Sequence, residues 1–248
     1  MYNFFVDDSN RQGDYYYITG SDHNHIRNVL RMKKGEQFLV SDGGMSNLCE
    51  IEDIDENTVV VRIIEENFKN AELPVKLYLF QGLPKSDKME LIIQKAVELG
   101  VYEIIPVEMK RCVVKLDDKR KKSRQTRCQA IAESAAKQSK RNIIPKVNEP
   151  LKYKEAIKLA QELDLFLVPY ENERGMTATK EALSLIKKDM SVGILIGSEG
   201  GFEREEIALA EEIGGKTISL GERILRTETA AITALGMCML HIELLSNR

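Results

Sequence analysis

Two glycine-containing loops carry the residues best suited to bind a ligand. The first reads GSEGGF at residues 197–202, and the second reads SLGERILRTET at residues 219–229. Glycines let the backbone approach a ligand closely and present its amides. The first loop lacks GxGxxG spacing, and it is followed by Glu203, Glu205 and Glu206. Acidic residues at a helix N-terminus disfavour a pyrophosphate, so a cationic or zwitterionic ligand fits this loop better.

The second loop combines apolar and cationic side chains. Ile224 and Leu225 could form a wall against an aromatic ring. Arg223 and Arg226 supply fixed positive charge and several N–H donors. Thr227 is predicted to be the N-cap of the helix that follows. Glycine turns after strands are common, but the two loops together indicate a ligand site.

Strands and helices alternate after residue 74 and place both loops at strand ends. Strands are predicted at residues 75–80, 104–107, 165–168, 192–196 and 217–220. Helices are predicted at residues 86–99, 117–141 and 228–245, with further helices between the later strands. Strands separated by helices form a parallel sheet, and ligands bind beyond the carboxyl ends of its strands. We therefore expect an α/β fold with both loops at one edge of the sheet.

The first 72 residues have the pattern of a small β-rich domain. A short helix is predicted over residues 21–31, with Ile26, Val29 and Leu30 on its apolar face. The predicted strands are residues 2–6, 15–18 and 58–64, and a hairpin of 38–40 and 48–54 around Asp42-Gly43-Gly44. A polar stretch ending at Pro74 separates this part from the rest, which predicts domains at 1–72 and 73–248.

The charge of the chain is unevenly distributed. The whole chain has a formal net charge of −3, whereas residues 108–146 carry 13 basic and 4 acidic side chains. Concentrated positive charge attracts polyanions through counterion release, so RNA or DNA is an expected partner. A solvated helix face is the alternative explanation.

Other features exclude several classes of protein. The 4 cysteines are widely spaced and there are 3 histidines, so neither a disulfide framework nor a metal site is expected. No uninterrupted apolar run reaches the length of a membrane span, and the N-terminus MYNFFVDD does not resemble a signal peptide. We expect a cytoplasmic protein that binds no membrane.

Five segments resemble the RsmE family of ribosomal RNA uridine N3-methyltransferases, which belongs to the SPOUT superfamily. Two of them are the loops at residues 197–202 and 219–231. The others are HIRNVLRM at 25–32, QGLPKSDKMELIIQKAVELGV at 81–101 and ESAAKQSKRNIIP at 133–145. The segments occur in the family's order and cover nearly the whole chain. Ser198 stands where the family usually has proline.

The resemblance implies a fold and an activity. Residues 1–72 would form a PUA-like β-barrel that binds RNA, and residues 73–248 a SPOUT α/β domain with a C-terminal trefoil knot. The family works as a homodimer, uses S-adenosylmethionine, and methylates N3 of a uridine in the decoding region of 16S ribosomal RNA, as free RNA or in the small ribosomal subunit. A cationic sulfonium with a zwitterionic tail agrees with the acidic, glycine-rich loop.

The resemblance also implies roles for particular residues. Arg226 would stabilise the imide anion that develops on uridine, and Glu228 is a weaker candidate for the general base. From spacing alone, Arg226 could instead form an ion pair with Glu199 or Glu228. The implied cofactor contacts are Gly197, Glu199, Gly200, Gly201, Ser219, Leu220, Gly221, Arg223, Ile224, Leu225 and Thr227.

RNA contacts are expected at two places. Arg27 and Arg31 are spaced i,i+4 on the short N-terminal helix. Lys137, Lys140 and Arg141 lie close together at the end of the basic helix. The last helix carries more apolar residues than one core face needs, which fits a core helix or a dimer interface.

Three other functions are open to the sequence. A related knotted methyltransferase could act on a ribose 2′-hydroxyl. A non-catalytic ribosomal RNA-binding module could have kept the loops without their chemistry. A dinucleotide-dependent oxidoreductase is the weakest alternative, because its glycine fingerprint is missing.

Overall fold

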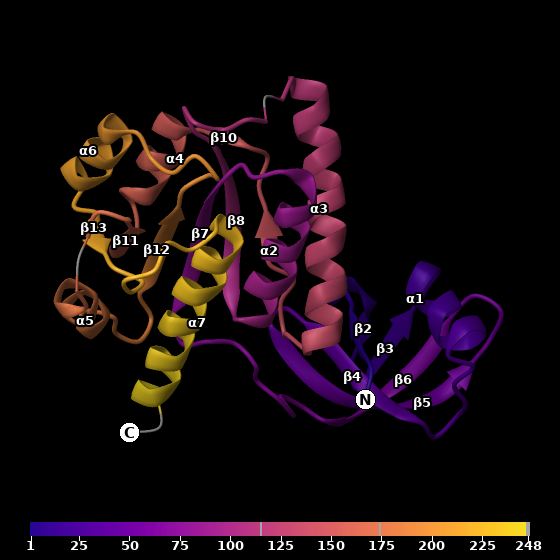
Figure 1. The fold of residues 1–248 in the computed structure, drawn as a ribbon. Helices are drawn as coiled ribbons and strands as arrows, with labels where there is room; N and C mark the ends of the chain where they lie inside the picture. The colour runs from indigo at the N-terminus through magenta and orange to yellow at the C-terminus, as the bar shows by residue number, and fades with distance from the viewer. Residues whose placement is uncertain (115, 174, 247–248) are drawn as a thin grey trace. The chain divides into compact units, whose positions relative to one another are not determined.

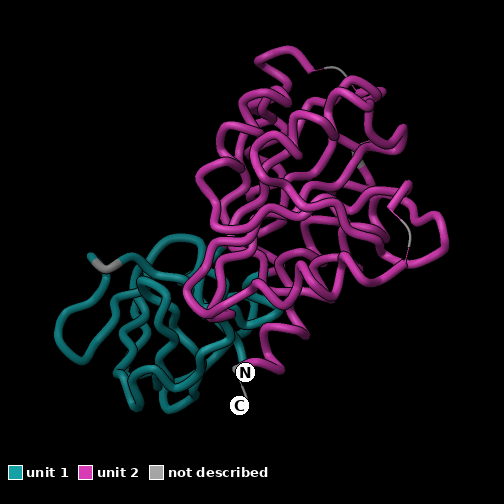
Figure 2. Tube along the Cα trace, turned by 90° about the vertical axis from the view of Figure 1, so that its left-hand side faces the viewer, with its two compact units in different colours: residues 1–72, 136–144 teal, residues 73–135, 145–248 magenta. Residues whose placement is uncertain are grey.

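The computed structural model describes residues 1–114, 116–173 and 175–246, and the chain forms two compact units. The first unit comprises Met1–Glu72 together with Ala136–Ile144, and the second comprises Leu73–Ala135 and Pro145–Arg248 (Figure 2). The sequence analysis assigned residues 136–144 to the second domain, whereas their contacts group them with the first unit; the domain bounds 1–72 and 73–248 stay a prediction.

The first unit is built on a six-stranded sheet in the order β1-β4-β5-β6-β3-β2. Its strands are β1 (Asn3–Phe5), β2 (Arg11–Gln12), β3 (Tyr15–Ile18), β4 (Gln37–Asp42), β5 (Met45–Ile54) and β6 (Val59–Glu65). The predicted hairpin is confirmed, because β4 and β5 pair antiparallel around Gly43 and Gly44. These glycines have φ of 54° and 92°, as a tight hairpin turn requires. Inward-facing residues such as Phe38, Val40 and Ile51 form the core of this unit.

The helix predicted over residues 21–31 is only partly present. It consists of α1 (Gly20–Asn24) and a π-helical turn, η2 (His25–Val29). The wider turn shows in the hydrogen bond from the N–H of Leu30 to the carbonyl of His25. Val29, predicted on the apolar face, is 64% exposed, and Arg31 has a left-handed φ of 55°. The prediction that Arg27 and Arg31 share a helix face is therefore wrong.

A buried ion pair attaches residues 136–144 to the first unit. Nε of Arg141 donates to Oε1 of Glu72 at 2.8 Å, and Arg141 is 2% exposed. The same carboxylate oxygen accepts the N–H of Asn142 at 2.8 Å. Nδ2 of Asn3, in β1, donates to the carbonyl of Arg141 at 3.0 Å. The ion pair and the hydrogen bonds thus hold together β1, Glu72 and residues 141–142, which are far apart in the sequence.

The second unit contains a parallel sheet in the order β10-β8-β7-β12-β11-β13, with β9 beside β8, which confirms the predicted sheet type (Figure 1). Its strands are β7 (Lys76–Gly82), β8 (Val101–Glu108), β9 (Lys146–Val147), β10 (Leu151–Lys152), β11 (Leu165–Pro169), β12 (Ser191–Ile196) and β13 (Lys216–Ile218). Strands β7 and β12 are buried at consecutive positions, so both faces of the sheet are covered. The two-residue strands β9 and β10 were not predicted, because they are too short to show a pattern.

Six helices accompany this sheet in the described part of the chain. They are α2 (Ser86–Glu98), α3 (Asp118–Ser139), α4 (Tyr153–Ala160), α5 (Thr177–Ser184), α6 (Arg204–Glu212) and α7 (Thr227–Ser246). Helices α2 and α7 pack on each other and on the central strands, whereas α4 and α6 cluster with Phe80, Ile105 and Phe166. The last residues of α3 belong to the first unit. The trefoil knot that the family resemblance implies stays a prediction.

The order of the strands decides which loops meet. Strand β12 lies between β7 and β11, and β13 pairs with β11 at the edge of the sheet. Because all these strands are parallel, the loops after β12, β11 and β13 emerge at the same edge. The loops at residues 197–202 and 219–226 are therefore separated by a third loop, which follows β11.

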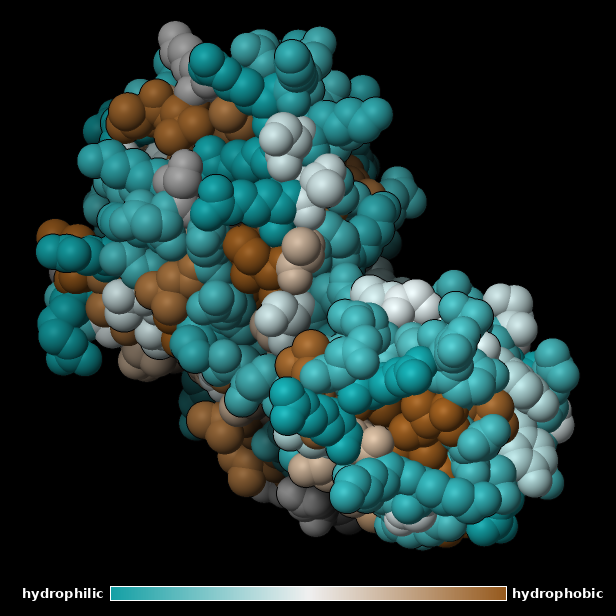
Figure 3. Space-filling view, turned by 90° about the vertical axis from the view of Figure 1, so that its right-hand side faces the viewer, coloured by the Kyte–Doolittle hydropathy of each residue, from teal (hydrophilic) through white to brown (hydrophobic). Residues whose placement is uncertain are grey.

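Exposed hydrophobic side chains are spread over the described residues, and three of them lie at the end of α7. The face in Figure 3 is mostly hydrophilic, with hydrophobic side chains in separate groups. In α7, Ala234 and Cys238 are fully buried, but Leu240 and Leu244 are 56% and 68% exposed. Among the described helices, α7 is the one long and apolar enough to cross a membrane by length and composition. The sequence analysis did not expect such a segment, because polar residues interrupt its apolar run.

We predict that Glu72→Ala destabilises the first unit by about 3 kcal/mol, because it removes the carboxylate that pairs with the buried Arg141 guanidinium. Urea denaturation at 25 °C measures the loss. Glu66→Ala is the matched control, since the ion pair of Glu66 with Arg11 is at the surface, and it should cost less than about 1 kcal/mol. Equal losses in the two variants would contradict the prediction.

Candidate functional site

A cavity of about 490 Å³ opens at the carboxyl edge of the parallel sheet. Its walls are the loops that follow β12, β11 and β13, and the start of α7. Ten of the eleven residues predicted to bind a cofactor line it, as does Arg226. The ten are Gly197, Glu199, Gly201, Ser219, Leu220, Gly221, Arg223, Ile224, Leu225 and Thr227. The structure thus brings the two predicted loops together in one cavity.

Thr227 joins the two loops but does not cap α7 as predicted. Its hydroxyl donates to the carbonyl of Gly197 at 2.6 Å and accepts from Nε2 of Gln81 at 2.9 Å. The N-cap position belongs to Arg226, whose carbonyl accepts the N–H of Ala230. The hydroxyl was expected to accept a backbone N–H from the first turn of α7. It instead connects the ends of β7 and β12 to the start of α7.

Glycines in and near the first loop have different roles. A Cβ atom on Gly82 would lie 2.6 Å from the backbone nitrogen of Ser198, so this glycine allows the loop to approach β7. Gly201 has a φ of 72°, which favours glycine. Gly200 does not line the cavity. It packs against Arg111, whose Cβ atom lies 2.8 Å from the position that a Cβ atom on Gly200 would occupy. Gly200 thus has a packing role, and its predicted contact with a cofactor stays a prediction.

Arg111 also holds the far side of this loop. Its Nη1 donates to the carbonyl of Gly200, and its Nε donates to Oε1 of Glu203, both at 3.0 Å. The hydrogen bond from Arg111 lowers the pKa of Glu203. Oε2 of Glu206 accepts the N–H of Glu203 at 2.8 Å in a capping box. The protein's own carboxylates thus occupy the N-terminus of α6, and they disfavour the binding of a pyrophosphate there.

The second loop is fixed at its start and exposed at its tip. Thr179 of α5 holds the backbone of Ser219, donating to its carbonyl and accepting from its N–H at 2.8 and 3.0 Å. The hydroxyl of Ser219 accepts the N–H of Gly221, which has a φ of 105°. Ile224 is 89% exposed at the edge of the cavity. The base of the loop is rigid, and its apolar tip faces solvent where an aromatic group could cover it.

Sequence reasoning missed one whole wall of the cavity. The loop after β11 contributes residues 169–173, including Glu171 and Glu173, and α2 contributes Lys88. The polar run YENE at residues 170–173, directly after a predicted strand, could have indicated this wall. The sequence did not show that this strand lies between the two strands that precede the predicted loops. Carboxylates outnumber cationic side chains in the lining by four to three. The cavity is therefore suited to a cationic or zwitterionic ligand.

The two acids considered as alternative partners of Arg226, Glu199 and Glu228, pair with Lys88. Its Nζ lies 3.6 Å from Oε1 of Glu199 and 3.3 Å from Oε2 of Glu228. Arg226 is exposed and forms no ion pair with another described residue, so its guanidinium is available at the cavity. Glu228 does not line the cavity, which weakens its predicted role as a general base.

The predicted RNA contacts have different surroundings in the first unit. Arg27 and Arg31 are exposed, and Arg27 donates to the carbonyl of Asp55 at 2.8 Å. Lys137 forms an ion pair with Asp22 at 3.0 Å, and Lys140 is half-buried. Arg141 is buried against Glu72, so the prediction that it contacts RNA is wrong.

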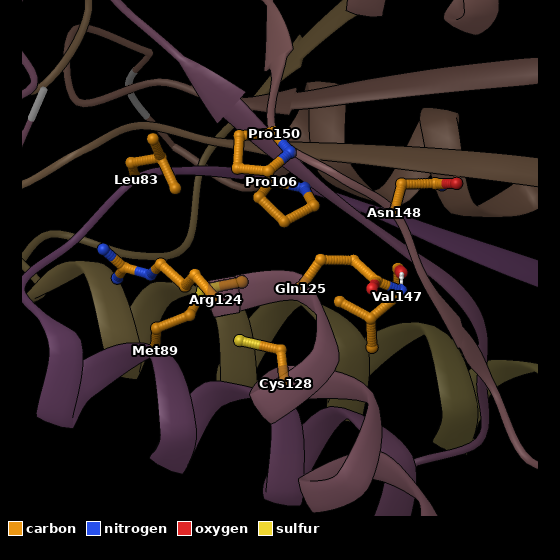
Figure 4. A pocket seen from close by; sticks show the side chains of 9 residues that line it. All are labelled: Leu83, Met89, Pro106, Arg124, Gln125, Cys128, Val147, Asn148 and Pro150. Carbon is orange, nitrogen blue, oxygen red and sulfur yellow. Dashed lines mark hydrogen bonds between the residues drawn. The ribbon is translucent and has the colours of Figure 1, made fainter. Parts of the chain in front are cut away.

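A second, much smaller cavity lies beside α3 in the second unit (Figure 4). Its volume of about 10 Å³ is about that of one water-sized probe, so it cannot hold a cofactor. Cys128 lines it, and burial raises the pKa of this thiol. No group of three His, Cys, Asp or Glu side chains is placed to hold a metal ion within residues 1–114, 116–173 and 175–246.

Comparison with known proteins agrees with this arrangement. Residues 71–239 match the family model of an RNA methyltransferase domain, and residues 18–64 match that of an RNA methyltransferase PUA domain. Ribosomal RNA small subunit methyltransferase E of Bacillus subtilis is 40% identical over 234 residues, which cover 93% of this chain and 91% of the relative.

Two solved structures have the same fold. Ribosomal RNA small subunit methyltransferase E of Neisseria gonorrhoeae, bound to S-adenosylmethionine, has a TM-score of 0.82 at 28% identity and covers 97% of each chain. A methyltransferase of Legionella pneumophila with the same bound cofactor has a TM-score of 0.80 at 32% identity and covers 96% of each chain. The chain therefore belongs to the RNA methyltransferase family of the ribosomal RNA small subunit methyltransferase E proteins, with a PUA domain at its N-terminus.

Proposed function

We propose that the protein transfers a methyl group from S-adenosylmethionine to N3 of a uridine in the decoding region of 16S ribosomal RNA. The observation that carries the proposal is the cavity in which both family loops meet. Its volume of about 490 Å³ is in the range of small-molecule sites. The solved relatives from Neisseria gonorrhoeae and Legionella pneumophila contain this cofactor.

The residues of the cavity fit S-adenosylmethionine. The backbone at Gly197 and Gly201 can approach the ligand closely, and Leu225 and the exposed Ile224 can cover its adenine. The excess of carboxylates suits the sulfonium and the ammonium of the ligand. When bound, S-adenosylmethionine supplies a methyl group on a cationic sulfur.

Arg226 is the residue that we assign to catalysis. N3 of uridine is an imide nitrogen that carries a proton and is a poor nucleophile at neutral pH. A guanidinium beside the base stabilises the negative charge that develops on the two carbonyl oxygens. It thereby lowers the pKa of N3, and the proton leaves to water. Glu228 faces Lys88 rather than the cavity, so we assign it to holding the site together.

The first unit supplies contacts for the RNA. Arg27 and Arg31 are exposed there, and Lys140 is half-buried. Contacts of this kind with phosphates give affinity without sequence choice. We place the protein in the cytoplasm, acting on 16S ribosomal RNA or the small ribosomal subunit.

A homodimer accounts for the apolar side of α7. One side of this helix packs in the core, whereas Leu240 and Leu244, one turn apart, are largely exposed. A second copy of the chain would cover these leucines.

Gly82→Ala is expected to weaken S-adenosylmethionine binding about tenfold, because the new methyl group would displace the backbone at Ser198. Isothermal titration calorimetry measures the change. Gly236→Ala is the matched control, because a Cβ atom on Gly236 in α7 would come no nearer than 4.0 Å to the side chain beside it, and it should leave the affinity unchanged. Wild-type affinity in a folded Gly82→Ala variant would show that the loop does not need this close approach.

Arg226→Ala is expected to lower the turnover number about 100-fold, with cofactor affinity nearly unchanged, because the developing charge loses its stabilisation. The assay incubates small ribosomal subunits lacking the modification with labelled S-adenosylmethionine. Mass spectrometry of the digested RNA identifies the product. The wild type should give 3-methyluridine; methylation of a ribose hydroxyl would refute the proposed target atom, and normal turnover of the variant would refute the role of Arg226.

Leu240→Glu combined with Leu244→Glu is expected to convert a dimer into a monomer at micromolar concentration, because two carboxylates would be buried at the interface. Sedimentation velocity measures the mass of the wild type and the variant. A wild-type protein that sediments as a monomer under these conditions would refute the dimer.

A further inference from the structure

We propose that Lys88 is a positioning residue: its ammonium links Glu199 of the loop after β12 to Glu228 of α7 and thereby fixes two walls of the cofactor cavity relative to each other. The inference rests on the proposed binding of S-adenosylmethionine to that cavity. Lys88 is the third residue of α2, and the sequence analysis gave it no role although it lies in the family segment 81–101.

The ion pairs of Lys88 are shielded from water. Its side chain and that of Glu199 are each 24% exposed, and that of Glu228 is 15% exposed. Lys95 of the same helix pairs with Glu98, but these side chains are 41% and 35% exposed. Ion pairs screened less by solvent couple their partners more strongly. Solvent therefore screens the attraction of Lys88 for its two partners less than it screens the shorter, hydrogen-bonded pair of Lys95 with Glu98.

The carboxylates depend on the lysine because of what else surrounds them. Oε2 of Glu228 is buried and accepts no hydrogen bond from the described residues. Oε1 of Glu199 accepts the backbone N–H of Lys85 at 3.1 Å, which anchors it at the start of α2. Without the ammonium, two partly desolvated carboxylates would face each other and repel. One of the segments that carry them would have to move.

These segments already share one link, and Lys88 provides the second. The hydroxyl of Thr227 binds the carbonyl of Gly197, and the ammonium joins the residues Glu228 and Glu199 close by. Two links between the same pair of segments fix their orientation as well as their separation. Gly197 and Thr227 both line the cavity, so the shape of the binding site follows from these links.

The experiment measures S-adenosylmethionine affinity by calorimetry and the melting temperature of four variants beside the wild type. Lys88→Met removes the ammonium, and Lys88→Arg keeps a positive charge. Lys88→Met combined with Glu228→Gln removes the repulsion as well. Lys95→Met removes a lysine from the exposed pair on the same helix and is the matched control.

Lys88→Met should bind the cofactor at least about tenfold more weakly than the wild type, while Lys88→Arg and Lys95→Met remain within a few-fold. Adding Glu228→Gln to Lys88→Met should recover affinity. If Lys88→Met does not fold, the same second substitution should restore the melting temperature. Full affinity in Lys88→Met, or no recovery by Glu228→Gln, overturns the proposal. Absence of binding by the wild type would instead refute the proposed cofactor.

Discussion

The geometry of the site depends on one hydroxyl group. Thr227 donates to the carbonyl of Gly197 and accepts from Gln81, so a single side chain connects the ends of two adjacent strands to the start of the last helix. Gln81 is fully buried, and Thr227 is nearly so. In such surroundings a lost partner costs more than the net value of one hydrogen bond, because the remaining polar groups have no water to replace it. The glycine at position 82 serves the same purpose, since it lets the loop approach the strand on which Gln81 lies.

The sequence predicted most of the elements but not their order in space. Periodicity and turn residues located the hairpin around Gly43 and Gly44 and the alternating strands and helices, because these signals are local. The position of β11 between β12 and β13 depends on the packing of the whole sheet, and the loop after β11 was missed for that reason. Arg141 was misassigned for the same reason. An arginine in a basic segment is predicted to contact RNA, and only the structure shows that it is buried against Glu72, far away in the sequence.

Charge has separate functions in different parts of the chain. Around the cavity, four carboxylates face three cationic side chains, one of which, Lys88, links two walls. Along α3, several basic side chains are engaged by nearby acids: Lys121 pairs with Glu108 and Arg127 pairs with Glu90. The positive charge counted in residues 108–146 is therefore partly structural. A net charge computed from a segment indicates RNA binding only after its ion pairs have been subtracted.

The discontinuous first unit constrains the order in which the protein can fold during synthesis. The strands of the PUA-like unit are complete at residue 65, but Arg141 and Asn142, which bind the carboxylate of Glu72, come some seventy positions later. When Glu72 leaves the ribosome, its partners have yet to be made, and the second unit has begun to be translated before they arrive. The last contacts of the first unit thus close only after β7, β8 and α3 have been synthesised, so the first unit is completed while the second is still being translated.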